Sequence, residues 1–359
     1  MHFGLTEEQD LLQEALRRFA TQELPATRLR ECFDEGSGEE PSLWSAAAEV
    51  GLQGLIVPEP YGGSGLEFLD LALAFEVLGE AALPGPYLAQ ALTALALVRS
   101  EDEEARARWL PSLATGDLIA GCALAESTET WAADRWTLEA KSGRWSGQKR
   151  YAELAPTTDI LLVGLAGGGL GLVEARDPGV SVAPLEGMDR SRPLAHVQLD
   201  GARVHPIDRD PSAGRAIVDA ACILLAADAF GAAGTLIRAT VEYTRTREQF
   251  GTPIAQFQAV KHQLASMLKE WEPMRGLIWS AAYSLDHRPD QLSREASTAK
   301  SHITDRAVQI GRDAVSLHGG LGFTWECDVH FFLKRAMHDR GWLGTPEAHR
   351  ERLAHAAGW

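Results

Sequence analysis

The chain has 359 residues, of which 45% are hydrophobic and 23% are charged, as is ordinary for a globular protein with room for two or three packed subdomains. Its 34 basic and 50 acidic side chains give a formal net charge of −16, which would repel nucleic acid and anionic membrane surfaces. The four cysteines (Cys32, Cys122, Cys222 and Cys327) are far apart and form no metal-ligand spacing. We therefore expect free thiols in a reducing compartment and no metal site.

No segment is predicted to carry the chain into a membrane. The N-terminal stretch MHFGLTEEQDLL is acidic and amphipathic, whereas a signal peptide has a basic start and an apolar core. Asp219 and Asp228 interrupt the apolar stretch DAACILLAADAFGAAG, which we expect to fall short of the ~20 residues that span a bilayer. The sequence thus predicts a cytoplasmic protein that binds neither membrane nor nucleic acid.

The chain begins with a predicted helical domain, residues 1–116. Thr6 and Gln9 form a plausible capping box before an apolar stripe, and Pro25 ends that helix. A second amphipathic pattern begins with Pro41, at a position suited to the first turn of a helix. Further amphipathic helices are expected up to the end of this region.

Two regions of different character follow. Residues 117–210 consist of short apolar or alternating runs separated by Gly, Pro and Asp turns, which predicts strands in a small barrel or sandwich. Residues 211–359 return to long helices rich in Ala and Leu. The stretch 216–250 is apolar on most faces, as expected for a helix buried in a bundle.

The segment YTRTREQFG, residues 243–251, places Arg245 and Arg247 at the end of this apolar stretch, just before Phe250. Two arginines at a helix end can be solvated cations that interact with the helix dipole. A rigid guanidinium beside an aromatic ring also suits a ligand that carries phosphate. The segment alone leaves both interpretations open.

The order of the three regions, together with four motifs, resembles the acyl-CoA dehydrogenase family over essentially the whole chain. The motifs are GLQGLIVPEPYGGSG (51–65), SGQKRYAELAPTTDILLV (146–163), YTRTREQFGTPIAQFQAVKHQLASM (243–267) and DAVSLHGGLGFTWE (313–326). Each is weak evidence alone, but their order and spacing are specific. The resemblance implies an α+β multidomain fold with a helical N-terminal domain, a middle β-barrel or sandwich and a C-terminal four-helix bundle. It also implies FAD as the cofactor.

In this family, the arginine that matches Arg247 reaches across a dimer interface to the FAD diphosphate of the neighbouring subunit. Gly319 and Gly320 match a turn whose backbone approaches the same FAD, which is possible because glycine has no Cβ. The resemblance therefore implies these cofactor-binding residues: Arg247, Gln249, Phe250, Gln258, His318, Gly319 and Gly320. A solvated helix-end cation remains the alternative for Arg247.

The expected catalytic base is missing. The family removes an α-proton and a β-hydride from an acyl-CoA thioester, which requires a carboxylate base and a flavin. Leu343 stands where most members carry a glutamate, and Ala221 and Cys222 stand where some relatives carry the base and an arginine. Asp219 and Asp228 on the same helix are more readily explained as paired carboxylates inside the bundle. We therefore predict no catalytic residue.

The segments that contact the flavin in this family are also altered. ALAESTETWAADRW keeps Glu126 but loses the usual Thr-Glu-Pro and Gly-Ser-Asp residues. Tyr151 could stack on the flavin in place of a tryptophan. Glu153 replaces a threonine near flavin N5, where a carboxylate would oppose the negative charge of the reduced ring. Ser316 replaces a glutamine at the adenine end.

Residues for this chain's own site are mostly lost, whereas those that serve a neighbour's FAD are mostly kept. The resemblance thus points to the non-catalytic subunit of a heterotetrameric (α2β2), steroid-type acyl-CoA dehydrogenase. Its partners would be a homologous catalytic subunit, the acyl-CoA substrate in the complex, and electron-transfer flavoprotein or a similar acceptor. The alternatives are a homomeric dehydrogenase with Asp228 or Glu347 as an unconventional base, a flavin-dependent monooxygenase on the same fold, and a purely structural or regulatory partner.

Overall fold

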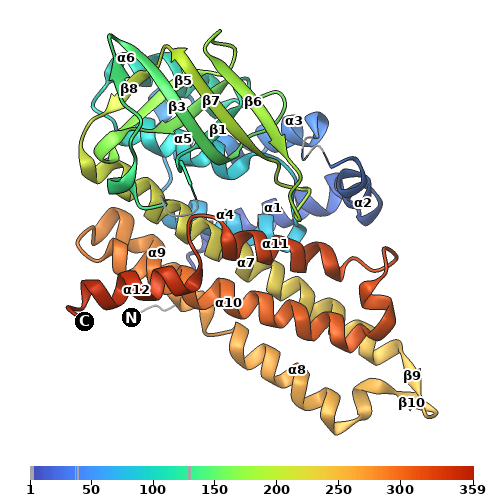
Figure 1. Ribbon diagram of the computed structural model, residues 1–359. Coiled ribbons are helices and arrows are strands. Elements are labelled where there is room, and N and C mark those ends of the chain that lie inside the picture. The colour runs from blue at the N-terminus through green and yellow to red at the C-terminus, as the bar shows by residue number, and fades with distance from the viewer. Residues whose placement is uncertain (1–3, 37, 39, 128–130) are drawn as a thin grey trace.

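The computed structural model describes residues 4–36, 38, 40–127 and 131–359, and it contains helices, then a sheet, then helices again (Figure 1). The N-terminal helices are α1 (Glu7–Glu23), α2 (Ala26–Glu35), α3 (Pro41–Glu49), α4 (Phe68–Ala81), α5 (Tyr87–Arg99) and α6 (Glu103–Ala114). The predicted capping box is confirmed, because Thr6 accepts from the Gln9 backbone and Gln9 accepts from the Thr6 backbone. Pro41 occupies the first turn of α3, also as predicted.

The predicted strands of the middle region pair into one sheet. They are β1 (Ala120–Ala123), β2 (Ala140–Lys141), β3 (Arg144–Glu153), β4 (Ile160–Gly164), β5 (Leu170–Glu174), β6 (Val180–Leu185), β7 (Leu194–Ala202) and β8 (His205–Asp208). The order is β6-β7-β3-β1-β4-β5-β8, with β2 paired to β3, and only β1 and β4 run parallel. Leu161 and Val163 face a core inside this region, while Ile160 and Leu162 face the main core of the chain.

The C-terminal region is helical. Its helices are α7 (Pro211–Thr246), α8 (Gln258–Trp271), α9 (Met274–His287), α10 (Leu292–His318), α11 (Val329–Gly341) and α12 (Pro346–Ala356). Helix α7 runs through the middle of the molecule, with α10 and α11 along it and α8 at the far edge (Figure 1). By length and composition α7 could cross a membrane, which corrects the expectation that its apolar stretch is too short. However, 94% of the apolar 18-residue stretch of this helix is buried inside the protein.

Two glycines allow α4 and α7 to cross in close contact. A Cβ on Gly79 would lie 1.9 Å from the carbonyl oxygen of Asp228, and a Cβ on Gly231 would lie 1.9 Å from that of Glu76. Only glycine permits such an approach of two backbones. The N-terminal and C-terminal helices consequently share one hydrophobic core. All four cysteines are free and buried.

Candidate functional site

The arginine singled out by the sequence lies at the end of α7. The Arg247 backbone N–H donates to the Tyr243 carbonyl, and its carbonyl accepts from the Ile254 backbone N–H, both at 2.8 Å. The guanidinium is exposed, and it forms no hydrogen bond or ion pair with any described residue. It is therefore free to bind an anion that this chain does not supply.

A two-residue hairpin follows Arg247. Strands β9 (Glu248–Gln249) and β10 (Thr252–Pro253) pair, which leaves Phe250 and Gly251 as the turn. Both turn residues have positive φ, +54° and +75°, as a tight hairpin of this kind requires. Positive φ is unfavourable for a bulky residue, and the Phe250 ring is 95% exposed. The Phe250 ring meets the Phe257 ring edge-on at 6.2 Å, but its exposure leaves most of it available to another molecule.

The glycine turn lies against the same end of α7. The His318 ring is buried, stacks on the Tyr243 ring at 4.3 Å, and contacts the Ala314 carbonyl through Nδ1 at 2.8 Å. Gly319 has φ +62° and ψ −142°, a conformation that essentially only glycine adopts. Gly320 is exposed, and a Cβ there would meet nothing within 4 Å. The fold therefore does not itself require glycine at position 320.

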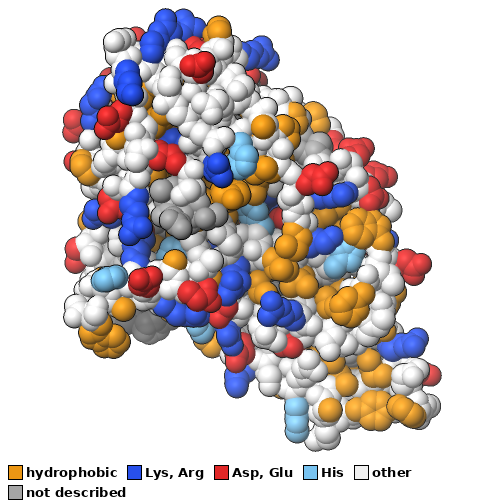
Figure 2. Space-filling view, viewed as in Figure 1, with side chains coloured by type: hydrophobic (Ala, Val, Ile, Leu, Met, Phe, Trp, Pro, Cys, Tyr) orange, Lys and Arg blue, Asp and Glu red, His pale blue; other side chains and the backbone are white. Residues whose placement is uncertain are grey.

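The structure brings the predicted cofactor-binding residues to one end of the helical region. Gln249, Phe250 and Gln258 are exposed around the hairpin, which is one turn beyond the Tyr243–His318 stack. Apolar side chains gather on this part of the surface, over the hairpin and the segment that joins α10 to α11 (Figure 2). The exposed apolar residues include Phe250, Phe257, Leu321, Phe323 and Trp325. An exposed apolar surface of this kind marks an interface or a ligand site.

The positions expected for a base hold no proton acceptor. Leu343 is buried, with φ +59°, and Ala221 and Cys222 are fully buried in α7. The His349 imidazole lies against these positions: its Nε2 donates to the Leu343 carbonyl at 3.1 Å and lies 3.7 Å from the Cys222 sulfur. Burial lowers the pKa of His349 to about 3 and raises that of the Cys222 thiol to about 12. These groups stay neutral at physiological pH.

Asp228, one of the two alternative bases, is held in a buried ion cluster. It accepts from Arg192 at 2.6 Å and from Arg335 at 2.7 Å through both oxygens. Burial alone would raise the pKa of Asp228, but the two guanidiniums outweigh that effect and hold its pKa below the usual range. Burial and the Asp228 charge raise the pKa of the neighbouring Asp339 well above normal. Asp228 therefore acts as the counter-ion of two arginines, as the pairing interpretation predicted.

The other carboxylates considered as bases are paired as well. Asp219 is buried, pairs with Arg352 at 2.7 Å, and accepts from Ser293 at 2.5 Å. Glu347 is exposed near the start of α12 and pairs with Arg340 at 2.9 Å. Backbone and Thr345 hydrogen bonds at the helix start lower the pKa of Glu347. A carboxylate stabilised in its ionised form is a weaker base.

Glu153 does not lie open beside a flavin site, which corrects the sequence-based expectation. Its side chain is fully buried, and neither oxygen makes a well-formed hydrogen bond within the described part of the chain. Burial raises the pKa of Glu153 to about 7, although Arg192 and Arg335 lower it. The carboxylate thus faces the ion cluster inside the protein.

Glu126, the retained residue of the altered flavin segment, has a structural role. It pairs with Lys149 at 2.8 Å and accepts from the backbone N–H groups of Thr137 and Leu138. Burial would raise the pKa of Glu126, but Lys149 and these hydrogen bonds lower it. Residues 128–130 of the same segment lie outside the described residues.

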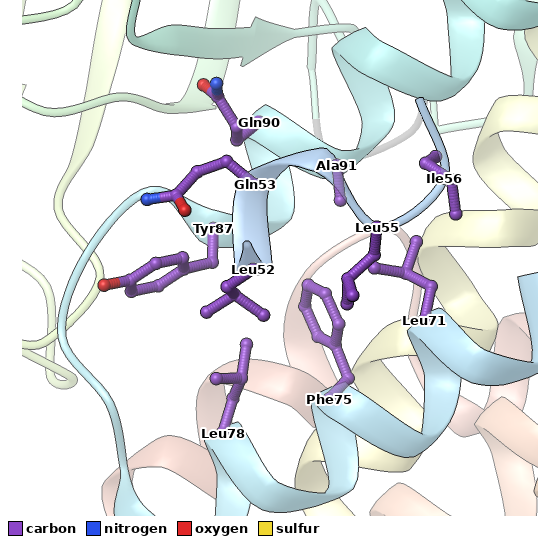
Figure 3. Close-up of a pocket in the computed structure, with 10 residues that line it drawn as sticks. All are labelled: Leu52, Gln53, Leu55, Ile56, Leu71, Phe75, Leu78, Tyr87, Gln90 and Ala91. Carbon is purple, nitrogen blue, oxygen red and sulfur yellow. The ribbon is translucent and has the colours of Figure 1, made fainter. Parts of the chain in front are cut away.

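A small cavity lies between α4, α5 and the segment around Leu52 (Figure 3). Its volume is about 10 Å³, enough for one water molecule, and its walls are mainly leucine and aromatic side chains. It is too small for a substrate or cofactor. Among the residues described, no group of three or more His, Cys, Asp or Glu side chains could hold a metal ion.

Comparison with known proteins identifies the family. Residues 6–117 match the model of the acyl-CoA dehydrogenase N-terminal domain, and residues 216–358 match that of the C-terminal domain. Acyl-CoA dehydrogenase IpdE2 of Mycobacterium tuberculosis is 30% identical over 97% of this chain and 96% of the relative. Acyl-CoA dehydrogenase FadE34 of the same organism is 35% identical over 87% of this chain, which spans 42% of that longer protein.

Solved structures agree. The "Tcur3481-Tcur3483 steroid ACAD G363A variant" has a TM-score of 0.91 and 30% identity, with 98% of this chain and 99% of that chain covered. Butyryl-CoA dehydrogenase from Megasphaera elsdenii has a TM-score of 0.89 at 23% identity, which supports the fold alone. This chain belongs to the acyl-CoA dehydrogenase family, whose members are oxidoreductases that act on CH–CH bonds.

Proposed function

We propose that this chain is the partner subunit of an FAD-dependent acyl-CoA dehydrogenase and completes the FAD site of a separate catalytic chain. The observation that carries the proposal is the free, exposed guanidinium of Arg247 beside the strained, exposed Phe250 and the open turn at Gly320. These residues fit the diphosphate of an FAD presented by another chain. FAD supplies the hydride acceptor for α,β-desaturation of an acyl-CoA thioester.

The residues at the family's two base positions support the same role. The positions of Leu343, Ala221 and Cys222 offer no carboxylate, and Asp228 is neutralised by two arginines. A homomeric enzyme with Asp228 as its base would have to break that ion cluster, at a high cost in free energy. We therefore place the base and the bound acyl-CoA in the catalytic chain.

The assembly and substrate follow from analogy. The description of the 30%-identical structure names two components and a steroid acyl-CoA dehydrogenase. We propose an α2β2 heterotetramer that acts on a bulky acyl-CoA, such as a steroid-derived ester, in the cytoplasm. Electrons would pass from its flavin to electron-transfer flavoprotein or a similar acceptor.

The first test is the FAD content of the purified protein, from its visible absorbance. The chain should be purified alone and co-expressed with any dehydrogenase-like chain that is encoded beside it. We expect little flavin alone and about one FAD per pair of chains together. Arg247→Ala should weaken FAD binding in the pair by roughly 30-fold or more, because one partner of a charged pair is removed.

Arg245→Ala is the matched control, since Arg245 is also exposed at the end of α7. It should leave the FAD content of the pair unchanged. One FAD per chain in the isolated protein would overturn the proposal. Equal effects of the two arginine substitutions would show that Arg247 contributes only general positive charge.

A further inference from the structure

The two walls between which a flavin and substrate would lie in this chain touch one another. Tyr151 and Glu153 of β3 are on the wall expected to carry the flavin, and Trp342 and Leu343 are on the wall expected to carry the base. The Trp342 Nε1–H donates to the Tyr151 carbonyl oxygen at 2.8 Å. Trp342 is 5% exposed, so its indole is packed between the walls and does not project into solvent.

Other aromatic rings close the same contact. The Trp131 ring lies 6.0 Å from the Tyr151 ring and 6.3 Å from that of Trp342. His196 of β7 meets Tyr151 edge-on at 5.6 Å, and His338 of α11 is roughly parallel to Trp342 at 6.3 Å. Aromatic rings therefore fill the junction between the sheet and α11.

The backbone is strained at both sides of this contact. Tyr151 has φ +55° and lies at an irregularity of the β3–β7 ladder, between Lys149 and Ala152. Leu343, next to Trp342, has φ +59°. A non-glycine residue in this conformation is strained, so the surrounding contacts must hold it in place.

Glu153 is fully buried beside the ion cluster. The carboxylate faces Arg192 and Arg335 from β3, and Asp228 faces the same arginines from α7. Arg335 also donates to the Leu83 carbonyl and to Ser191, so the cluster connects the N-terminal helices, the sheet region and α11. The donor that a flavin N5 would need at position 153 is replaced by an acceptor, and that acceptor is sealed from the cleft.

We propose that Trp342 and Glu153 exclude flavin from this chain's own cleft, so that the chain takes part only in the FAD site of its partner. The inference rests on the proposed function and names the side chains responsible for the loss of this chain's own FAD site. Trp342 occupies the space and ties its two walls together. Glu153, which is fully buried, leaves the strand without the hydrogen-bond donor that a flavin N5 would need.

The test is FAD binding to the isolated full-length chain, measured by equilibrium dialysis and flavin fluorescence. We expect the wild type to bind little FAD and the double variant Trp342→Ala/Glu153→Thr to bind it roughly tenfold more tightly or better. Trp359→Ala, which removes an exposed tryptophan near the end of the chain, is the control and should match the wild type. Far-ultraviolet circular dichroism checks that each variant is folded.

Trp342→Leu provides a second variant, since it keeps most of the apolar volume but removes the N–H donor. Increased FAD binding by either folded variant supports the proposal. If the folded variants bind no more FAD than the wild type, or if the wild type already binds FAD in this cleft, the proposal is wrong. Arg247→Ala in the two-chain complex reports on the partner's FAD site alone, so the two proposals can fail separately.

Discussion

The carboxylate of Glu153 is buried in a position that destabilises the folded chain at neutral pH. Burial raises its pKa to about 7 despite the two facing arginines, whereas an unfolded glutamate titrates near ~4.3. Between these pH values the folded chain keeps the proton and the unfolded chain releases it. The free energy of unfolding therefore falls as the pH rises through this range, and the full penalty, about 4 kcal/mol, is present above pH ~7.

Glu153→Gln should remove this pH dependence, because the amide does not ionise. We expect the substitution to stabilise the chain by about 2.5 kcal/mol more at pH ~8 than at pH ~5. Urea unfolding at the two pH values measures the difference. Glu347→Gln, at an exposed site, is the control. A Glu153→Gln effect of the same size at both pH values would contradict the assignment of the raised pKa.

At the scale of elements, the sequence predicts those helices and strands whose signals are local. The capping box at Thr6 and Gln9, Pro41 at the start of α3, and the turn-separated strands of the middle region are all present. Each depends on residues within a few positions of one another, so a single sequence is sufficient.

The ion cluster and the closed cleft could not be predicted in this way. Asp228 meets Arg192 and Arg335 across separations of 36 and 107 residues, and Trp342 meets Tyr151 across 191. Nothing near any of these residues in the sequence indicates its partner. The burial of Glu153, and hence its separation from a flavin site, depends on the same long-range contacts.

Helix α8 buries few of its side chains within this chain. Of its 14 residues only Met267 is buried, whereas α7 has buried residues along almost its whole length. Leu268 of α8 and Phe257 just before it are exposed apolar residues. A helix of this length with so few buried side chains is marginal in water.

We therefore expect α8 to exchange its amide hydrogens much faster than α7 in the isolated chain. Co-expression with the catalytic chain should slow the exchange in α8 and leave that in α7 nearly unchanged. Hydrogen exchange read by mass spectrometry gives both rates in one experiment. If α8 of the isolated chain were protected as strongly as α7, no partner would be needed to cover it.

At the scale of the whole molecule, the close crossing of α4 and α7 joins the first and last helical regions into one core. Phe75 and Leu78 of α4 belong to the same buried cluster as Phe230 and Leu236 of α7. The three regions, residues 1–116, 117–210 and 211–359, therefore describe the order of the elements along the sequence, and the two helical regions share one core. We expect the two helical parts to unfold together.

Gly79→Ala tests this expectation, because the added Cβ would lie 1.9 Å from the Asp228 carbonyl oxygen and would push α4 and α7 apart. Overpacking of this kind costs about 1–3 kcal/mol. If the helical regions form one unfolding unit, amides of α10 should exchange faster together with those of α4. For amides that exchange through global unfolding, the increase should be roughly 5- to 150-fold. Gly276→Ala in α9 is the control, since its Cβ would meet nothing within 4 Å. Faster exchange confined to α4 would instead show that the N-terminal helices open independently, and the shared core would then not determine how the chain unfolds.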